Sequence, residues 1–223
     1  MQILDRIEKR RFVGREFLLW LWFESETFEA TLETRKHGSF GLWIERQLVL
    51  SAGAEATRIK GSYPGGSREA KEALLVGKLP EAAGLHVSWG DREITFTLKA
   101  ERLAISGLSL PTVLDGSGEE APALAEARPP RKRKNARPTE EDREDDAGYE
   151  SFYERMRLTR EVEELLETLY RDFLTLRLGA AWNTVVLPAL RPWVEGAKRV
   201  DPEVYRKKRS AALGGVARRS AGR

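Results

Sequence analysis

The sequence contains two histidines, His37 and His86, and no cysteine. These are the only side chains that could supply an imidazole or thiolate ligand to a metal. Structural and catalytic zinc or iron sites combine several such ligands at short spacings, for example H-x-x-x-H. His37 falls in an expected turn and His86 at a polar-facing position of an expected strand, where a solvated side chain is the ordinary interpretation. The sequence therefore predicts no metal site.

Nucleotide and serine chemistry also lack their motifs. There is no G-x-x-x-x-G-K-[ST] phosphate loop and no G-x-S-x-G nucleophile turn. A metal-dependent nuclease needs two or three acids and a lysine, which Asp91, Glu93 and Lys99 could supply. Asp91 is better explained by its turn, and Glu93 and Lys99 by the solvent-facing side of a strand. We expect a protein that is not an enzyme and needs no cofactor.

Basic residues gather in two segments that could bind phosphate. The segment RPPRKRKNARPTEEDREDD carries Arg128, Arg131, Lys132, Arg133, Lys134 and Arg137 ahead of an acidic block, Glu140 to Asp146. It is either a phosphate-binding run or a spacer whose two charge blocks pair with each other. The tail has no competing acidic block and is the better candidate, through Arg206, Lys207, Lys208, Arg209, Arg218 and Arg219.

The distribution of charge supports this division. Residues 1–127 hold 16 basic and 19 acidic side chains, whereas residues 200–223 hold 7 basic and 2 acidic. The presumed folded part is slightly acidic, and the excess positive charge lies in segments that look unfolded.

The stretch GREFLLWLWFESE, Gly14 to Glu26, is the most apolar part of the chain. Its uninterrupted apolar run covers only Phe17 to Phe23, whereas a bilayer-spanning helix needs roughly 20 residues. The apolar residues occupy every face at helical spacing, which is typical of a helix surrounded by protein. We therefore expect a core helix and no membrane span.

Period-two patterns predict a small antiparallel sheet behind this helix. Segments 27–34 and 40–50 form an expected hairpin around a turn at 37–39, and segments 85–89 and 94–98 form a second around Gly90-Asp91. Between them Ser67 caps an expected short helix that Gly77 closes. The segment LAISGLSLP supplies a last strand. The expected fold class is α+β, a small antiparallel sheet packed with helices.

Beyond the sheet, apolar content falls sharply. We predict an α+β domain over 1–114, a disordered charged linker over 115–148, a helical segment over 149–199 and a basic tail over 200–223. The helical segment rests on a strong 3.6-residue pattern with Thr159 as its expected cap, followed by a shorter helix broken near Pro188 and Pro192.

The order of features in residues 12–110 resembles the C-terminal half of the recombination-associated protein RdgC family. The matching pieces are FVGREFLLWLWFESE, the strand pair ending in ERQLVL, TRIKGS, REAKEALLVGK, LHVSWGDREITFTL and LAISGLSLP. The later segment EVEELLETLYRDFLTLRL looks like the closing helix of that family. The motifs are patterns of apolar and small residues and not catalytic signatures.

The resemblance implies a non-catalytic protein that binds DNA without sequence preference, forms a ring around duplex DNA and restrains RecA-dependent recombination. Carried over by position, the basic residues beside the DNA channel are Arg58, Lys60, Arg68, Lys71 and Lys78. The other half of the ring would come from a homodimer or from a separate chain. The absence of cysteine and of an apolar export signal at the N-terminus predicts a cytoplasmic protein, and the resemblance implies association with the nucleoid.

A second function remains open from the residues alone. The amphipathic helix at 159–178 could lay its apolar face on a partner, which would make the chain an assembly module with no direct role at DNA.

Overall fold

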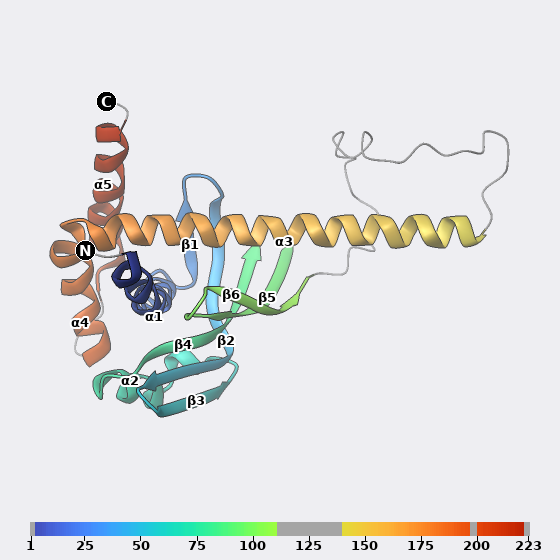
Figure 1. The fold of residues 1–223 in the computed structure, drawn as a ribbon. Helices are drawn as coiled ribbons and strands as arrows, with labels where there is room; N and C mark the ends of the chain where they lie inside the picture. Colours follow the sequence, from blue (N-terminus) through green and yellow to red (C-terminus); the bar gives the residue numbers. More distant parts are fainter. Residues whose placement is uncertain (1–2, 111–139, 197–199, 221–223) are drawn as a thin grey trace. The chain divides into compact units, whose positions relative to one another are not determined.

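The computed structural model describes residues 3–110, 140–196 and 200–220, and the side-chain surroundings of residues 13–110, 152–196 and 200–214. Two compact units divide the chain: Met1–Leu110 together with Glu164–Arg223, and Pro111–Glu163. The elements of the first unit up to Leu110 are, in chain order, α1 (Ile3–Thr27), β1 (Thr31–Thr34), β2 (Gly38–Ala52), β3 (Glu55–Gly61), η1 (Pro64–Gly66), α2 (Arg68–Leu75), β4 (Leu79–Trp89), β5 (Arg92–Lys99) and β6 (Ala104–Ser109) (Figure 1).

Helices make up the rest of the described chain. The long helix α3 (Glu140–Leu178) begins in the second unit and ends in the first. After it come η3 (Trp182–Val186), which is one turn of π-helix, α4 (Leu187–Glu195) and α5 (Pro202–Ser220). The expected fold class, an α+β protein with a small antiparallel sheet packed with helices and a helical C-terminal segment, is confirmed.

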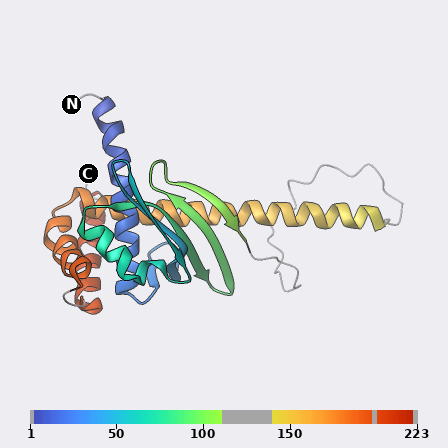
Figure 2. The same ribbon diagram turned by 90° about the horizontal axis from the view of Figure 1, so that it is seen from below.

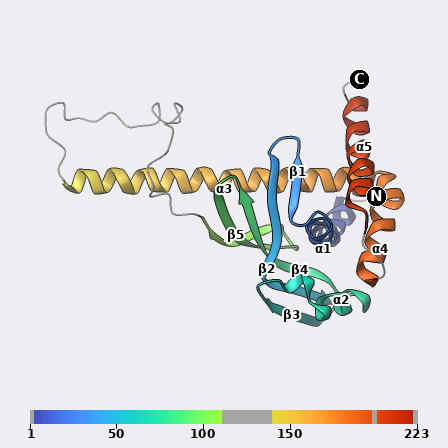
Figure 3. The same ribbon diagram turned by 180° about the vertical axis from the view of Figure 1, so that it is seen from behind.

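The six strands of the described residues belong to one antiparallel sheet in the order β1-β2-β4-β5-β6, with β3 paired to β2. The long strand β2 carries β1 along its first residues and β3 along its last, as Figure 3 shows. Its pairing with β4 is interrupted by register shifts between Ile44 and Leu48 and between Val49 and Leu50. Because bulges bend a strand and increase its twist, the sheet is strongly curved (Figure 2).

Strand alternation buries one face of the sheet and leaves the other partly exposed. The buried face is made by Leu42, Ile44, Leu48 and Leu50 of β2, Leu85 and Val87 of β4, and Ile94, Phe96 and Leu98 of β5. Both expected hairpins form, and the β4–β5 turn contains Gly90 and Asp91 as predicted. Ser67 caps α2 by accepting a 3.1 Å hydrogen bond from the Ala70 amide, which confirms the predicted cap.

The second half of α1, from Phe17 onward, is the centre of the core. Six of the seven apolar residues from Phe17 to Phe23 are each at most 1% exposed: Phe17, Leu18, Trp20, Leu21, Trp22 and Phe23. The sheet contributes β2 and β4 to one side of α1, and Figure 1 shows α4 and α5 on the other. The interpretation of this apolar stretch as core is confirmed.

Aromatic contacts fasten the three C-terminal helices to α1. Phe17 and Trp20 contact Phe173 of α3, with ring centroids 5.5 and 5.7 Å apart. Phe23 contacts both Trp193 of α4, at 5.4 Å, and Tyr205 of α5, at 5.3 Å. Edge-to-face and tilted aromatic pairs at such distances stabilise a core beyond their buried area.

The helical region differs from its sequence prediction in three respects. The helix α3 starts at Glu140, inside the predicted linker, so Thr159 is an interior residue whose hydroxyl donates to the Arg155 carbonyl and is not a cap. Pro192 lies within α4 and does not break it. Whether the helix packs on the sheet was left open by the sequence, and residues 164–178 belong to the same compact unit as the sheet. The predicted basic tail forms α5, with Tyr205 and Arg209 buried.

The predicted linker can be compared with the structure only in part, because residues 111–139 lie outside the described chain. Among the described helices, none is both long and apolar enough to cross a membrane by itself. One pair, Phe152–Leu178 with Trp182–Glu195, meets the length and composition requirement jointly, across a bend of 89°.

Candidate nucleic-acid interface

The solvent face of the sheet, opposite α1, carries a row of basic side chains. Arg58 and Lys60 are exposed and separated by one residue of β3, so they lie on the same face, while Ile59 between them is buried. Arg58 is paired with Val49, Val49 with Ala82, and Ala82 with Lys99. Lys99 is also exposed, and we call Arg58, Lys60 and Lys99 the basic row.

The strand geometry sets the dimensions of the basic row. Arg58 and Lys99 are three strand spacings apart, or about 14 Å, and Lys60 lies about 7 Å along β3 from Arg58. All three ammonium or guanidinium groups are on flexible stems, so each can move several ångströms toward a bound anion. This separation is close to the roughly 12 Å width of the major groove, and the row can therefore reach phosphates on both of its edges.

Three of the five basic residues carried over from the resemblance lie away from this face. Arg68, on α2, donates to Glu72 one turn further along at 2.6 Å. Lys78 bonds the Thr57 hydroxyl at 3.0 Å and Glu55 at 3.5 Å. Because Thr57 points to the opposite side of β3 from Arg58, Lys78 lies on the helical side of the sheet.

Lys71 is half-buried between two indole rings and is tied to α1. Its Nζ lies 3.2 Å from the ring centroid of Trp193 and 4.6 Å from that of Trp22, and 2.8 Å from Glu26 Oε2. Burial lowers the pKa of Lys71 to about 8, against the opposing effect of Glu26. The same carboxylate accepts hydrogen bonds from the indole N–H groups of Trp22 and Trp193. Lys71 thus joins α2 to α1 and α4 and is not presented to a phosphate.

The predicted tail residues divide between surface and core. Lys207 and Lys208 are exposed on α5. Arg206 pairs with Glu203 at 3.2 Å and lies over the Phe28 ring. Arg209 is only 5% exposed and its Nε lies 3.4 Å from Glu24 Oε2, so it is not available to DNA. The structure does not describe the side chains of Arg218 and Arg219. It also does not describe any part of Arg131, Lys132, Arg133 and Lys134.

The buried Glu24 of α1 lies in the contact between α1 and α5. Its Oε1 accepts a 2.6 Å hydrogen bond from the Tyr205 hydroxyl, and the guanidinium of Arg209 stands beside its other oxygen. Complete burial raises the pKa of Glu24, which Arg209 and Tyr205 partly offset. A buried carboxylate needs such partners, and both come from the segment predicted to be a free tail.

His86 lies on the same solvent face as the basic row, between two carboxylates. Its Nδ1 faces Glu45 of β2 and its Nε2 faces Glu93 of β5. The Trp43 ring packs against the imidazole with centroids 4.1 Å apart. Ser88 donates a 2.8 Å hydrogen bond to Glu93, which lowers the pKa of that carboxyl together with the contact to His86.

This cluster does not form a metal site. The two carboxylates occupy opposite sides of the imidazole ring and do not converge on a common point. Among the described residues, no group of three or more His, Asp or Glu side chains is arranged to hold a metal ion.

A small hollow separates the cluster from the basic row. Opposite Gly84, β2 inserts Glu45, Arg46 and Gln47 between Ile44 and Leu48, with Arg46 at a left-handed φ of 66°. A side chain at position 84 would collide with the Glu45 carbonyl oxygen, 2.2 Å away. The resulting cavity has a volume of about 60 Å³, which is enough for a few water molecules and too little for a nucleotide.

The three residues considered for a metal-dependent nuclease site, Asp91, Glu93 and Lys99, do not lie together. Asp91 lies in the β4–β5 turn, and Glu93 is engaged by Ser88 and His86. Lys99 is at the opposite end of β5, about 20 Å from Glu93 along the strand. The three side chains therefore do not form a common site.

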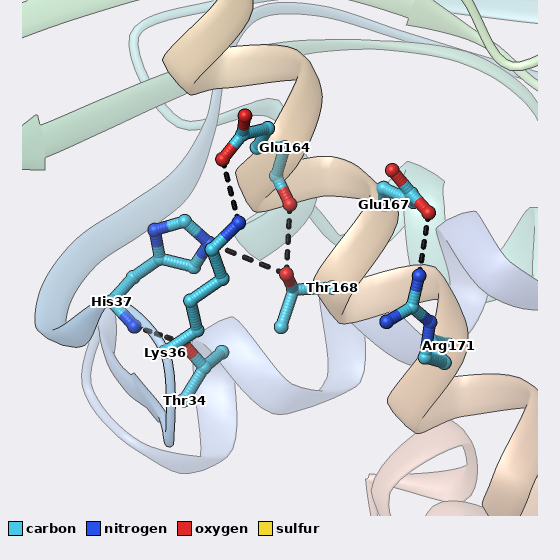
Figure 4. A network of polar contacts seen from close by, with 7 residues as sticks. All are labelled: Thr34, Lys36, His37, Glu164, Glu167, Thr168 and Arg171. Atoms are coloured by element: carbon cyan, nitrogen blue, oxygen red, sulfur yellow. Dashed lines mark hydrogen bonds and ion pairs between the residues drawn. The ribbon is translucent and has the colours of Figure 1, made fainter.

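His37 has a structural role instead. Figure 4 shows the β1–β2 turn against α3, where His37 Nε2 lies 3.3 Å from the Thr168 hydroxyl and Lys36 bonds Glu164 at 2.6 Å. Along α3, Arg171 bonds Glu167 one turn away. The His37 ring also packs edge-on against Trp89, at 5.1 Å. These contacts fix the turn on the helix.

The apolar face of α3 within the first unit is already occupied. Leu165, Leu169, Phe173 and Leu176 are each at most 1% exposed. Exposed apolar side chains of α3 occur earlier, at Phe152, Tyr153 and Met156, and at its last residue, Leu178.

Sequence reasoning missed Lys99 as a member of the basic row, and the contact of Glu45 with His86. The exposed position of Lys99 follows from strand alternation, but its alignment with Arg58 depends on the strand order β3-β2-β4-β5. Comparisons of the chain with protein-family models, with curated proteins and with solved structures found no match.

Proposed function

We propose that this protein is a non-catalytic DNA-binding protein that contacts the phosphate backbone without reading base sequence. The observation that carries the proposal is the basic row, three exposed cations aligned across β3 and β5 on the free face of a curved sheet. Contacts of this kind neutralise phosphates and carry no sequence information.

The surroundings of the basic row support this proposal. None of its three members makes an ion pair with a residue that the structure describes, in contrast to Arg68, Lys71 and Lys78. Lys207 and Lys208 add exposed positive charge on α5. The resemblance to the RdgC family leads to the same function, and we propose recombination at the nucleoid as its setting.

The alternative role as an assembly module through the 159–178 helix has less support. A partner cannot pack on Leu169, Phe173 and Leu176 without opening the core. We therefore do not assign a partner to that face.

The test is fluorescence anisotropy of two labelled duplexes of unrelated sequence, titrated with the full chain over a series of salt concentrations. The proposal predicts the same affinity for both duplexes and a steep decrease of that affinity with salt. Strong preference for one sequence, or no binding at low ionic strength, would overturn it. Incubation with magnesium or manganese should leave both duplexes intact.

A further inference from the structure

The two hydrogen bonds of His86 require a particular protonation state. Ionised Glu45 and Glu93 can only accept hydrogen bonds, and each faces a different ring nitrogen. A neutral imidazole has one N–H and can donate to only one of them. The arrangement is complete only when the ring carries both protons and a positive charge.

The contacts described for His86 are made with groups that favour this cation or are neutral. Glu45 approaches from β2 and Glu93 from β5, and both are acidic. The Trp43 ring, also from β2, packs against the imidazole and can interact with its positive charge. Thr95 is the direct register partner on β5. Ser88, on β4 itself, holds Glu93 through its hydroxyl.

The imidazole also connects three strands of the DNA-facing sheet. It lies on β4 and bonds side chains of β2 and β5, next to the hollow at Gly84 that Glu45 helps to line. When His86 loses a proton, one carboxylate is released and the face becomes one unit less positive. Lys99 lies four residues along β5 from Thr95, about 14 Å away, a distance at which charges still interact at low ionic strength.

We propose that His86 makes DNA binding by the basic row depend on pH, with tighter binding when the imidazole is protonated and bridges Glu45 to Glu93. This inference rests on the proposed function. Histidine is the side chain that ordinarily changes its charge between about pH 5 and 8. Loss of the proton would weaken the hold on phosphate.

The presence of only two histidines makes a clean experiment possible. Duplex affinity would be measured by anisotropy at about pH 6 and about pH 8, at one low ionic strength, for the natural chain, His86→Gln and His37→Gln. We expect the natural chain and His37→Gln to lose about three- to tenfold in affinity at the higher pH. His86→Gln should show little change. Equal pH dependence in all three proteins would overturn the inference while leaving the proposed function intact.

A second variant and a second measurement keep the inference testable if His86→Gln does not fold or if the protein does not bind DNA. Glu93 is largely exposed, and Glu93→Gln should keep the fold while moving the pH dependence of binding to lower pH. In protein with nitrogen-15-labelled histidine, the NMR chemical shifts of the ring nitrogens at about pH 6 should show both nitrogens of His86 protonated. The spectrum of His37→Gln, which retains only the His86 signals, assigns them. A neutral ring there would overturn the switch. Absence of DNA binding at both pH values would instead overturn the proposed function, and this inference with it.

Discussion

Tyr205 donates a buried 2.6 Å hydrogen bond to Glu24, joining α5 to α1 across 181 residues of sequence. The Tyr205 ring packs on Phe23 and Phe28, so its hydroxyl is delivered to the carboxylate by apolar contacts. The C-terminal helix is therefore part of the core and not an appendage to it.

Removal of that hydroxyl should destabilise the whole first unit. Tyr205→Phe keeps the ring but leaves Glu24 Oε1 without its donor, and an unsatisfied buried polar group costs about 1–3 kcal/mol. Urea unfolding should show a loss of that size. The matched control is Tyr153→Phe, an exposed tyrosine whose hydroxyl removal should have little effect. Equal stability of the two variants would contradict the described role of Tyr205.

The half-buried ammonium of Lys71 should make stability rise with pH in the alkaline range. Its folded pKa of about 8 is below the ordinary value of 10.5, so the unfolded chain binds more protons between these values. Stability therefore increases as pH rises through that window. We expect a gain of about 1–2 kcal/mol between pH 8 and 9.5.

This gain should be absent in Lys71→Met, which cannot titrate. Measurements should stop below pH 10, because burial raises the pKa of Tyr63 to about 12 and its titration would act in the opposite direction. Parallel pH profiles for the natural chain and Lys71→Met would contradict the assignment.

Substitution of Gly14 by alanine should reverse the usual effect of helix propensity. In a helix interior, alanine is favoured over glycine by about 1 kcal/mol. At Gly14, however, a Cβ would lie 2.1 Å from the Ala100 carbonyl oxygen, a backbone atom that cannot rotate away. We expect Gly14→Ala to lower the free energy of unfolding by about 1–3 kcal/mol. The midpoint of thermal unfolding should fall accordingly. A stabilised variant would show that α1 and the β5–β6 turn are not in close contact.

Features that depend on residues close together in the sequence could be predicted, and features that depend on distant residues could not. The alternation of Ile94, Phe96 and Leu98 and the Ser67 cap are local signals, and both were read correctly. The start of α3 was missed because its charged residues were interpreted as disorder, although Glu and Arg are good helix formers.

The contacts that define the candidate site are non-local. A single Tyr205 within a basic segment gives no periodic apolar pattern, so its burial could not be predicted. The basic row depends on the order of four strands, which no local pattern specifies. The same is true of His86, whose partners come from two other strands.

The fold changes how the C-terminal segment should be tested. Deletion of residues 200–223 removes Tyr205 and Arg209 and exposes Phe23 and Phe28, so the truncated chain should lose stability. The double variant Lys207→Ala, Lys208→Ala removes only exposed charge. It should keep the unfolding midpoint and lower duplex affinity modestly, as measured by calorimetry and anisotropy. An unchanged affinity for the duplex would show that α5 does not contact DNA.

The central claim is that the basic row contacts DNA, and the most direct test is the salt dependence of binding when that row is reversed. The triple variant Arg58→Glu, Lys60→Glu, Lys99→Glu would be compared with the natural chain and with Arg191→Glu, an exposed charge reversal on α4 in the helical layer. Each lost phosphate contact should reduce the slope of log affinity against log salt by about 0.9. We predict a reduction of about 2–3 in the triple variant and little change for Arg191→Glu. An unchanged slope in a folded triple variant would show that DNA does not bind at this face.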